Sequence, residues 1–373
     1  MTSPSETIWP IEPHTLIKHR ILERYLQGWL PVMAKTNGRI HFLDGFAGPG
    51  RYSAGEIGSP LIALQALLSH PHFKNATNQR EVVFSFFERD KSRADALREE
   101  LKRVSLPSWV SCNVFDGEFA PLLSSILDKF QAEGSQLAPT FAFIDPFGFA
   151  GVPMGLIARI ATNAKCECFI TFMYEEINRF LSVPSVADHY DALFGTSKWR
   201  EIVDETDSGR RRDRIADLYR KQLETVAGFK FVREFQMVNR GNRTKYFLYF
   251  GTKSEKGLSL MKAAMWKADP GGGEIFSDRT NENQVVLFEP SPDFSRLGSM
   301  LTQRFSGQGP IDISEIEKYV LIETPFSETM HLRKKTLGQM EKSVPKLIEV
   351  YRPKGKANRA GSYPPGTKIK FVQ

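Results

Sequence analysis

Long apolar runs and cysteines are both scarce in this sequence. No apolar stretch approaches the roughly 18 residues that a membrane-spanning helix needs, and the opening residues, MTSPSETIWPIEP, have neither the basic nor the apolar region of a secretion signal. Among 373 residues there are only three cysteines, an odd number and too few for a disulfide scaffold. These absences argue against a membrane protein or a secreted one and predict a cytoplasmic protein.

The sequence also lacks a full set of zinc ligands and the glycine fingerprint of dinucleotide-binding domains. Cys166 and Cys168 alternate in an apolar stretch and would share one face of a strand, but no third or fourth ligand follows nearby, as a zinc site would require. We therefore expect no metal site. The glycine fingerprint G-x-G-x-x-G of dinucleotide-binding domains is also missing, which argues against an oxidoreductase.

The sequence does contain enough apolar material for a large core. Hydrophobic residues make up 41% and aromatic residues 12% of the chain, including 28 phenylalanines. This composition excludes a disordered protein. The length suits one large domain and a smaller one.

The excess positive charge, +7 in total, is confined to the end of the chain. Residues 296–373 contain 14 Lys and Arg against 7 Asp and Glu, whereas residues 1–295 contain 36 of each. Residues 351–373 contain six bases and no acid. A neutral body with a basic appendage predicts nucleic acid as a partner, bound through the appendage. The alternative is a solvated basic tail.

Strand and helix patterns alternate over most of the chain. An amphipathic helix is expected at residues 13–33, with apolar side chains at four-residue spacing. Short apolar runs, expected to be strands, follow at residues 40–43, 82–87, 109–115, 141–144 and 168–173. Helical segments separate most of them, which predicts an α/β fold with a parallel sheet covered on both faces. Functional groups then belong at the carboxyl ends of the strands, where several acids fall.

Residues 175–228 interrupt this alternation with a charged, mostly helical insertion. Residues 229–237 and 245–251 then read as an antiparallel hairpin that closes the sheet. We expect one domain over residues 1–290, including the insertion, and a second over residues 291–373.

The last segment has a pattern of its own. A helix is expected to start with a capping box of Ser314 and Glu317, and a second helix to start at Ser327. Strand-like runs follow at residues 347–351 and 367–372. Helix, turn, helix, two strands and a basic loop is the plan of a winged helix. Its expected nucleic-acid contacts, on the second helix and in the wing, are Arg333, Lys334, Lys335, Lys354, Lys356 and Arg359.

A glycine-rich loop follows the first expected strand. Glycines let a backbone approach a ligand without a side chain in the way, although a lone loop of this kind is weak evidence for a nucleotide site. Its sequence pattern, D-x-F-A-G-x-G, resembles the first motif of S-adenosylmethionine-dependent methyltransferases. The resemblance implies cofactor contacts from Asp44, Gly45, Phe46, Ala47, Gly48 and Gly50.

Acids also end the next two strands. A carboxylate in the position of Glu88 can accept both hydroxyls of a ribose, although Glu88 follows Asp44 by 44 residues instead of the roughly 20 of the dinucleotide fold. The alternative is an exposed acid in a charged run. Asp116 ends the third strand, where a carboxylate could meet an adenine amino group.

Asp145, Pro146, Phe147 and Gly148 form the sharpest motif. They follow an apolar strand and resemble the fourth motif of nucleic-acid amino methyltransferases, usually written D/N-P-P-Y/F. In that motif a carboxylate oxygen and a backbone carbonyl hold the exocyclic amine, and the aromatic residue stacks on an extruded base. In this chain the motif has only one proline, and its D-P-F-G pattern is closer to that of the tRNA guanine-N2 dimethyltransferases, so the identity of the base stays open. The alternative is a structural turn.

Over nearly the whole chain, the segments FLDGFAGPG, FFERD, FIDPFG, YFLYFGT and RAGSYPPGTKIKF resemble the three-Cys-motif partner proteins. That name refers to cysteines of a neighbouring protein, not to the three in this chain. The resemblance implies a Rossmann-like class I methyltransferase sheet with a terminal winged helix. It also implies S-adenosylmethionine as cofactor and a three-cysteine, radical-type protein as partner.

Two functions follow from these observations. The first is an enzyme that transfers a methyl group from S-adenosylmethionine to a base amino group of DNA or RNA, with the D-P-F-G motif as its catalytic group. Such an attack requires positioning more than acid–base help. The second is a non-catalytic partner or regulatory subunit of the same fold, which binds nucleic acid and the three-cysteine protein. The missing second proline favours it.

Overall fold

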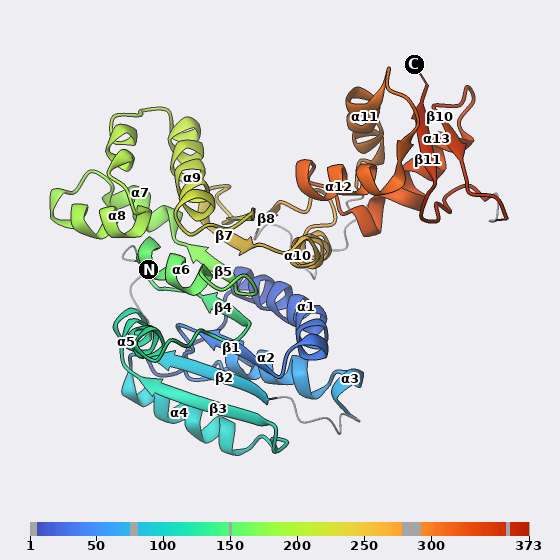
Figure 1. The fold of residues 1–373 in the computed structure, drawn as a ribbon. Helices are drawn as coiled ribbons and strands as arrows, with labels where there is room; N and C mark the ends of the chain where they lie inside the picture. Colours follow the sequence, from blue (N-terminus) through green and yellow to red (C-terminus); the bar gives the residue numbers. More distant parts are fainter. Residues whose placement is uncertain (1–5, 75–80, 149–150, 278–291, 356–358, 373) are drawn as a thin grey trace. The chain divides into compact units, whose positions relative to one another are not determined.

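The computed structural model describes residues 6–74, 81–148, 151–277, 292–355 and 359–372 (Figure 1). The chain divides into two compact units, Met1–Gly257 with Ile275–Asn281 and Leu258–Glu274 with Glu282–Gln373. The domain boundary expected at residues 290 and 291 lies outside the described residues. Most of helix α10 (Glu255–Ala268) belongs to the second unit. No helix in the described ranges is long and apolar enough to cross a membrane.

An eight-stranded sheet forms the centre of the first unit, in the order β3-β2-β1-β4-β5-β7-β6-β8. Its strands are β1 (Arg39–Asp44), β2 (Glu81–Glu88), β3 (Val110–Asp116), β4 (Thr140–Ile144), β5 (Glu167–Phe172), β6 (Phe231–Val238), β7 (Thr244–Thr252) and β8 (Ile275–Ser277). β1 to β5 pair in parallel, whereas β7 runs antiparallel to β5 and β6. The expected mostly parallel, Rossmann-like α/β sheet with an antiparallel hairpin strand is therefore confirmed. Its strand order reverses between β1 and β4, the place where such sheets bind ligands.

Helices cover both faces of this sheet. They are α1 (Pro13–Thr36), α2 (Ser59–Leu68), α3 (Pro71–Lys74), α4 (Lys91–Lys102), α5 (Phe119–Ala132), α6 (Met154–Ala161), α7 (Tyr174–Phe180), α8 (Ala187–Phe194) and α9 (Ser208–Thr225), with two short 3-10 helices, η1 (Pro184–Val186) and η2 (Lys198–Ile202). Successive side chains of a strand point to opposite faces. Phe141 of β4 accordingly packs on Tyr25 of α1, with ring centroids 5.0 Å apart. The next residue, Ala142, lies in the core that α5 to α9 form on the other face.

Helix α1 supports much of the site described below. Pro13 suits its first position, because proline has no backbone N–H to leave unpaired there. The expected apolar positions Ile17, Ile21, Tyr25 and Trp29 are all buried. The helix also buries three polar side chains that its apolar spacing does not predict. These are His14, Lys18 and His19.

The second unit has its own hydrophobic core. It contains most of α10, α11 (Phe294–Phe305), α12 (Ile313–Glu323), the π-helix η3 (Glu328–Leu337), α13 (Gly338–Lys342) and an antiparallel sheet of β9 (Ile311–Asp312), β10 (Ile348–Tyr351) and β11 (Lys368–Phe371) in the order β10-β11-β9. Trp266 ties α10 to this core, and its indole N–H donates to the Pro325 carbonyl oxygen at 2.8 Å.

The capping box expected at Ser314 and Glu317 is wrong. α12 begins at Ile313, and its N-cap is Asp312, whose carboxylate accepts a hydrogen bond from the Ser314 N–H at 2.9 Å. Aspartate caps as well as serine does, so the sequence offers two neighbouring caps and the fold uses the earlier one. The expected cap at Ser327 is confirmed, since it is the N-cap of η3.

Candidate active site

A cavity of about 420 Å³ lies at the carboxyl ends of β1 to β4, and is here named the strand-end cavity. Its lining includes Gly45, Phe46, Glu88, Asp90, Glu118, Pro146 and Phe147. These residues come from the ends of four neighbouring strands and the turns that follow them. The sheet thus gathers one group from each of the segments that the sequence singled out, because the carboxyl ends of parallel strands share one edge.

Glu88 connects this cavity to the glycine loop. Its Oε2 accepts a hydrogen bond from the Gly48 N–H at 2.9 Å, and its Oε1 accepts one from the Asp90 N–H at 2.8 Å. Only 9% of the residue is exposed. A carboxylate oxygen has two lone pairs, so each oxygen keeps one acceptor position that a ligand in the cavity can use.

Asp44 is a buried carboxyl group at the end of β1. Its Oδ1 accepts a hydrogen bond from the Phe46 N–H at 3.1 Å, whereas Oδ2 has no hydrogen-bond partner among the described residues. Burial raises the pKa of Asp44 to about 7, and the Ser59 side chain and the Phe46 N–H partly oppose this rise. The nearby carboxylates of Asp145 and Glu88 add to it.

The glycines of the loop act through their backbone conformation. Gly48 and Gly50 have φ angles of +62° and +84°, which favour glycine over other residues. A Cβ on Gly50 would lie 2.9 Å from Leu97 Cδ1, whereas one on Gly48 would make ordinary contact with Trp9 at 3.8 Å. Neither glycine lines the cavity. Their role here is to shape the turn that carries the Gly48 N–H to Glu88.

A second cavity of about 260 Å³ adjoins the first, because Pro146 and Phe147 line both. Four aromatic rings form much of its wall, and we name it the aromatic cavity. They are Trp9, Tyr52, Phe147 and Tyr246. Its other polar lining residues are Glu12, His14, Thr15, Lys18, Asp145, Thr171 and Lys245. The lining of this cavity therefore comes largely from elements outside the strand-end motifs, namely the N-terminal segment, α1, β5 and β7.

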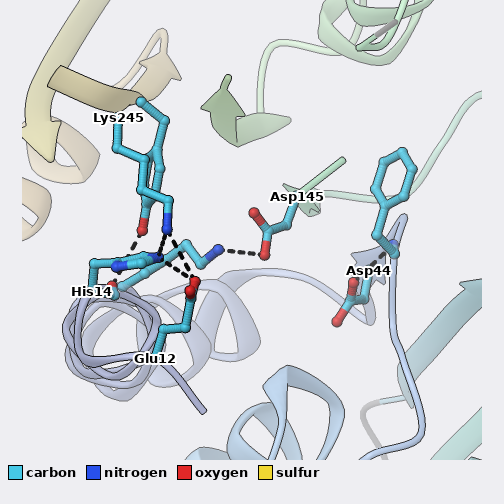
Figure 2. A network of polar contacts seen from close by, with 8 residues as sticks. Glu12, His14, Asp44, Asp145 and Lys245 are labelled. Carbon is cyan, nitrogen blue, oxygen red and sulfur yellow. Dashed lines mark hydrogen bonds and ion pairs between the residues drawn. The ribbon is translucent and has the colours of Figure 1, made fainter. Parts of the chain in front are cut away.

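Asp145 forms an ion pair across the aromatic cavity. Its Oδ2 lies 2.5 Å from the Lys18 ammonium of α1 (Figure 2). The side chains of Lys18 and Asp145 are 7% and 20% exposed. Among the described residues, Asp145 Oδ1 has no hydrogen-bond partner. One oxygen of the motif's acid is therefore held by the protein, and the other is available to a ligand.

A second polar group lies at the start of α1. Lys245 Nζ is 2.9 Å from His14 Nε2 and 3.1 Å from Glu12 Oε2, and His14 Nε2 is 2.8 Å from the same glutamate oxygen. The hydrogen bond from His14, together with Lys245, lowers the pKa of Glu12 to about 2. Figure 2 shows these three side chains converging, with Asp145 between them and Asp44 in that view.

The structure sorts the residues that the sequence put forward. Gly45, Phe46, Glu88, Pro146 and Phe147 line the strand-end cavity, and Asp145 lines the aromatic one. Asp44, Ala47, Gly48 and Gly50 belong to the loop but not to the lining. Gly148, with φ of +84°, completes the turn after Phe147. Asp116 is exposed and lines neither cavity, and the turn that follows it, Gly117 and Glu118, takes its place.

Sequence reasoning missed the polar residues that α1 and β7 supply. The signal that could have found them is the pair His14 and Lys18, four residues apart, next to the apolar stripe that begins at Ile17. Residues four apart lie on the same face of a helix, one turn from each other, so this spacing brings the two basic side chains together. Lys245 has no comparable signal, because it is a single lysine near the start of the otherwise apolar strand β7.

The basic residues of the second unit are mostly at its surface. Lys334, Lys335, Lys354 and Arg359 are exposed, and Lys356 lies outside the described residues. Arg333 is different, because it donates to Glu317 Oε1 at 2.7 Å and to the Tyr363 carbonyl oxygen at 2.5 Å. Arg333 therefore stabilises this unit, which limits its use for a ligand.

The three cysteines are free thiols, two of them buried. Within the described ranges, no group of three or more His, Cys, Asp or Glu side chains could hold a metal ion.

No family model and no curated protein matches the sequence, so the resemblance to the three-Cys-motif partner proteins stays a prediction. Among solved structures, the chain is similar to a putative methyltransferase from Porphyromonas gingivalis, with 10% identity, 57% of this chain and 37% of that chain covered, and a TM-score of 0.26. It is also similar to a putative caffeoyl-CoA O-methyltransferase from Staphylococcus aureus (11% identity, 65% and 86% covered, TM-score 0.30). A third similar structure is an SAH-bound methyltransferase from Podospora anserina (13% identity, 65% and 89% covered, TM-score 0.27). The chain thus spans little more than a third of the P. gingivalis protein.

Proposed function

We propose that the protein is an S-adenosylmethionine-dependent methyltransferase that acts on a base amino group of DNA or RNA. The observation that carries the proposal is the junction of the two cavities at Pro146 and Phe147. A cofactor in the strand-end cavity and a base in the aromatic cavity would meet at this motif, beside Asp145. Methyl transfer to an amine depends on such positioning more than on acid–base groups.

The residues around the strand-end cavity fit S-adenosylmethionine, which when bound supplies a methyl group on a sulfonium centre. Glu88 would accept the ribose hydroxyls with the acceptor positions that its two backbone N–H bonds leave open. The methionine part would lie against Gly45 and Phe46, the loop residues that line the cavity. The buried Asp44 would hold their turn through its hydrogen bond from the Phe46 N–H. The adenine would lie against Gly117 and Glu118, beside the position that the sequence gave to Asp116.

The residues of the aromatic cavity fit a base that has left its stack. Asp145 Oδ1 and the Pro146 carbonyl oxygen would accept the two hydrogens of the amine and turn its lone pair toward the methyl group. Phe147 is 41% exposed and would stack on the base. In this arrangement the amine nitrogen would take the methyl group, S-adenosylhomocysteine would be the leaving product, and the amine would release one proton to solvent.

We further propose that the second unit is a winged-helix domain that binds the phosphate backbone. The support is its element order, α11, β9, α12, η3 with α13, then β10 and β11. The exposed bases Lys334, Lys335, Lys354 and Arg359 lie on η3 and in the loop between the last two strands. They would contribute sequence-independent affinity.

The test is to incubate the pure protein with methyl-labelled S-adenosylmethionine and mixed DNA and RNA. Asp145→Ala should lose transfer by at least about 100-fold, because a small misplacement of the amine is costly in rate, while its calorimetric affinity for S-adenosylhomocysteine stays close to wild type. The matched control is Asp128→Ala, an exposed acid on α5. Loss of cofactor binding in Asp145→Ala would make Asp145 a cofactor residue, and full activity would make the motif a structural turn.

One observation favours the second function, a non-catalytic subunit that binds nucleic acid and a three-cysteine partner protein. Lys18 already occupies one oxygen of Asp145, and the motif lacks a second proline. In that case the wild-type protein would bind cofactor and nucleic acid but form no labelled product in the same assay.

A further inference from the structure

The arrangement of Lys18 and Asp145 points to the kind of amine that the aromatic cavity accepts. Both side chains line this cavity. A lysine ammonium has three N–H donors, and among the described residues its only hydrogen-bond partner is Asp145 Oδ2. The cavity therefore presents a hydrogen-bond donor directly beside Asp145 Oδ1, the acceptor that is left for the amine.

A matching ligand has an amine directly beside a hydrogen-bond acceptor. Cytosine and adenine have this pattern on their Watson–Crick edge, because a ring nitrogen with a free lone pair adjoins the carbon that bears the amine. Guanine presents a ring N–H beside its amine on that edge, while its acceptor N3 lies on the other side of the amine, away from this edge. A guanine read on its Watson–Crick edge would therefore bring its ring N–H to the Lys18 ammonium, donor against donor. An aliphatic amine has no neighbouring acceptor. Extruded bases are read on this edge.

The walls of the cavity suit a single base. Its volume of about 260 Å³ lies below the roughly 300–1,000 Å³ of pockets for drug-sized ligands, which suits a ligand of the size of one base. Tyr246 also fixes the donor, because Lys18 Nζ lies 5.4 Å from the centre of its ring. Burial of the lysine side chain keeps water from replacing the ligand's acceptor.

We propose that Lys18 is a specificity-determining residue, which selects cytosine or adenine over guanine by donating to the ring nitrogen beside the amine. The inference rests on the proposed function for the identity of its site. It concerns recognition of the base, however, and recognition can be measured without methyl transfer. It also narrows the base that the D-P-F-G motif leaves open to cytosine or adenine, against guanine.

The experiment compares bases that differ in one ring atom. The full chain is titrated, by fluorescence anisotropy, into single strands of about 12 nucleotides, made as DNA and as RNA, that contain one test base among thymines or uracils. The test bases are cytosine, 3-deazacytosine, adenine, 1-deazaadenine and guanine. A hydrogen bond from a charged donor is stronger than a neutral one. We therefore expect wild type to bind cytosine or adenine at least about ten-fold more tightly than its deaza analogue and than guanine.

Lys18→Met should bind each base and its deaza analogue equally, whereas Lys35→Met, an exposed lysine of the same helix, should keep the wild-type ratio. Because Lys18→Met leaves Asp145 without its partner, the double variant Lys18→Met/Asp145→Asn repeats the test without an unpaired charge. Equal binding of base and analogue by wild type, or a preference for guanine, overturns the proposal. If discrimination is present but no methyl group is transferred, the proposed function fails and the role of Lys18 stands. If transfer occurs without discrimination, the reverse holds.

Discussion

The Glu88 carboxylate of β2 accepts a hydrogen bond from the Gly48 backbone N–H at 2.9 Å, and this contact ties the loop after β1 to the neighbouring strand. Gly48 can present that N–H because its φ is +62°. In the left-handed region, a residue with a Cβ costs about 1–2 kcal/mol. The proposed ribose-binding carboxylate is therefore held in place by a conformation that favours glycine.

Gly48→Ala should weaken the binding of S-adenosylhomocysteine, measured by calorimetry, because the strained loop withdraws its N–H from Glu88. Gly134→Ala is the matched control. Gly134 has nearly the same φ, +63°, with open space around its Cβ position, and it follows α5 away from both cavities. Both variants should lose about 1–2 kcal/mol of stability, but only Gly48→Ala should lose cofactor affinity. Equal affinities in the two variants would remove the loop from the cofactor site.

Asp44 should make stability depend on pH. Because burial raises its pKa from 3.8 to about 7, the folded protein keeps a proton that the unfolded chain releases between these values. The contribution of Asp44 is therefore complete at low pH and is lost as the pH rises to about 7. Relative to Asp44→Asn, which has no proton to release, wild type should lose up to about 1.4 kcal/mol per pH unit over this window. Urea unfolding at several pH values measures the difference, and a constant difference would contradict the prediction.

Lys262 should be essential for the second unit. Its buried ammonium donates to the carbonyl oxygens of Val320, Leu321 and Thr324 at 2.8–2.9 Å, at the end of α12. Lys262→Met would remove this donor from all three carbonyl oxygens, although that of Val320 keeps the Thr324 hydroxyl at 2.8 Å. The change should cost about 3 kcal/mol, seen as a lower melting temperature and faster hydrogen exchange in α12. Lys267→Met, an exposed position of the same helix, should change stability by about 0.5 kcal/mol or less.

Charge reversal should locate the nucleic-acid surface. Changing Lys334, Lys354 and Arg359 together to Glu should weaken binding to all sequences and reduce the slope of log affinity against log salt by about 0.9 for each lost contact on duplex DNA. The control variant changes three exposed basic residues of the first unit, Lys35, Lys102 and Arg103, to Glu and so has the same net charge. If that control lowers the slope equally, net charge and not the second unit accounts for binding.

The strand ends illustrate what the sequence alone determined. Apolar runs followed by acids predicted parallel strands, and because the carboxyl ends of such strands meet at one edge, they also predicted that Glu88 and Asp145 belong to one site. Asp116 shows the limit of this reasoning. An apolar run marks where a strand ends, but it does not determine the path of the turn that follows. Asp116 ends β3 and is exposed, whereas Glu118, in the turn after the strand, lines the cavity.

Tertiary structure alone decided the polar half of the aromatic cavity. The apolar spacing of α1 determined a helix with one buried face, because every third or fourth residue lies on the same side. It did not determine whether a charged side chain at the edge of that face is buried or exposed to solvent, because the spacing is the same in both cases. Lys18 meets Asp145 across 127 positions of sequence, and His14 meets Lys245 across 231. Contacts at such separations depend on how helix and sheet pack, since burial makes these charges costly unless each finds its partner.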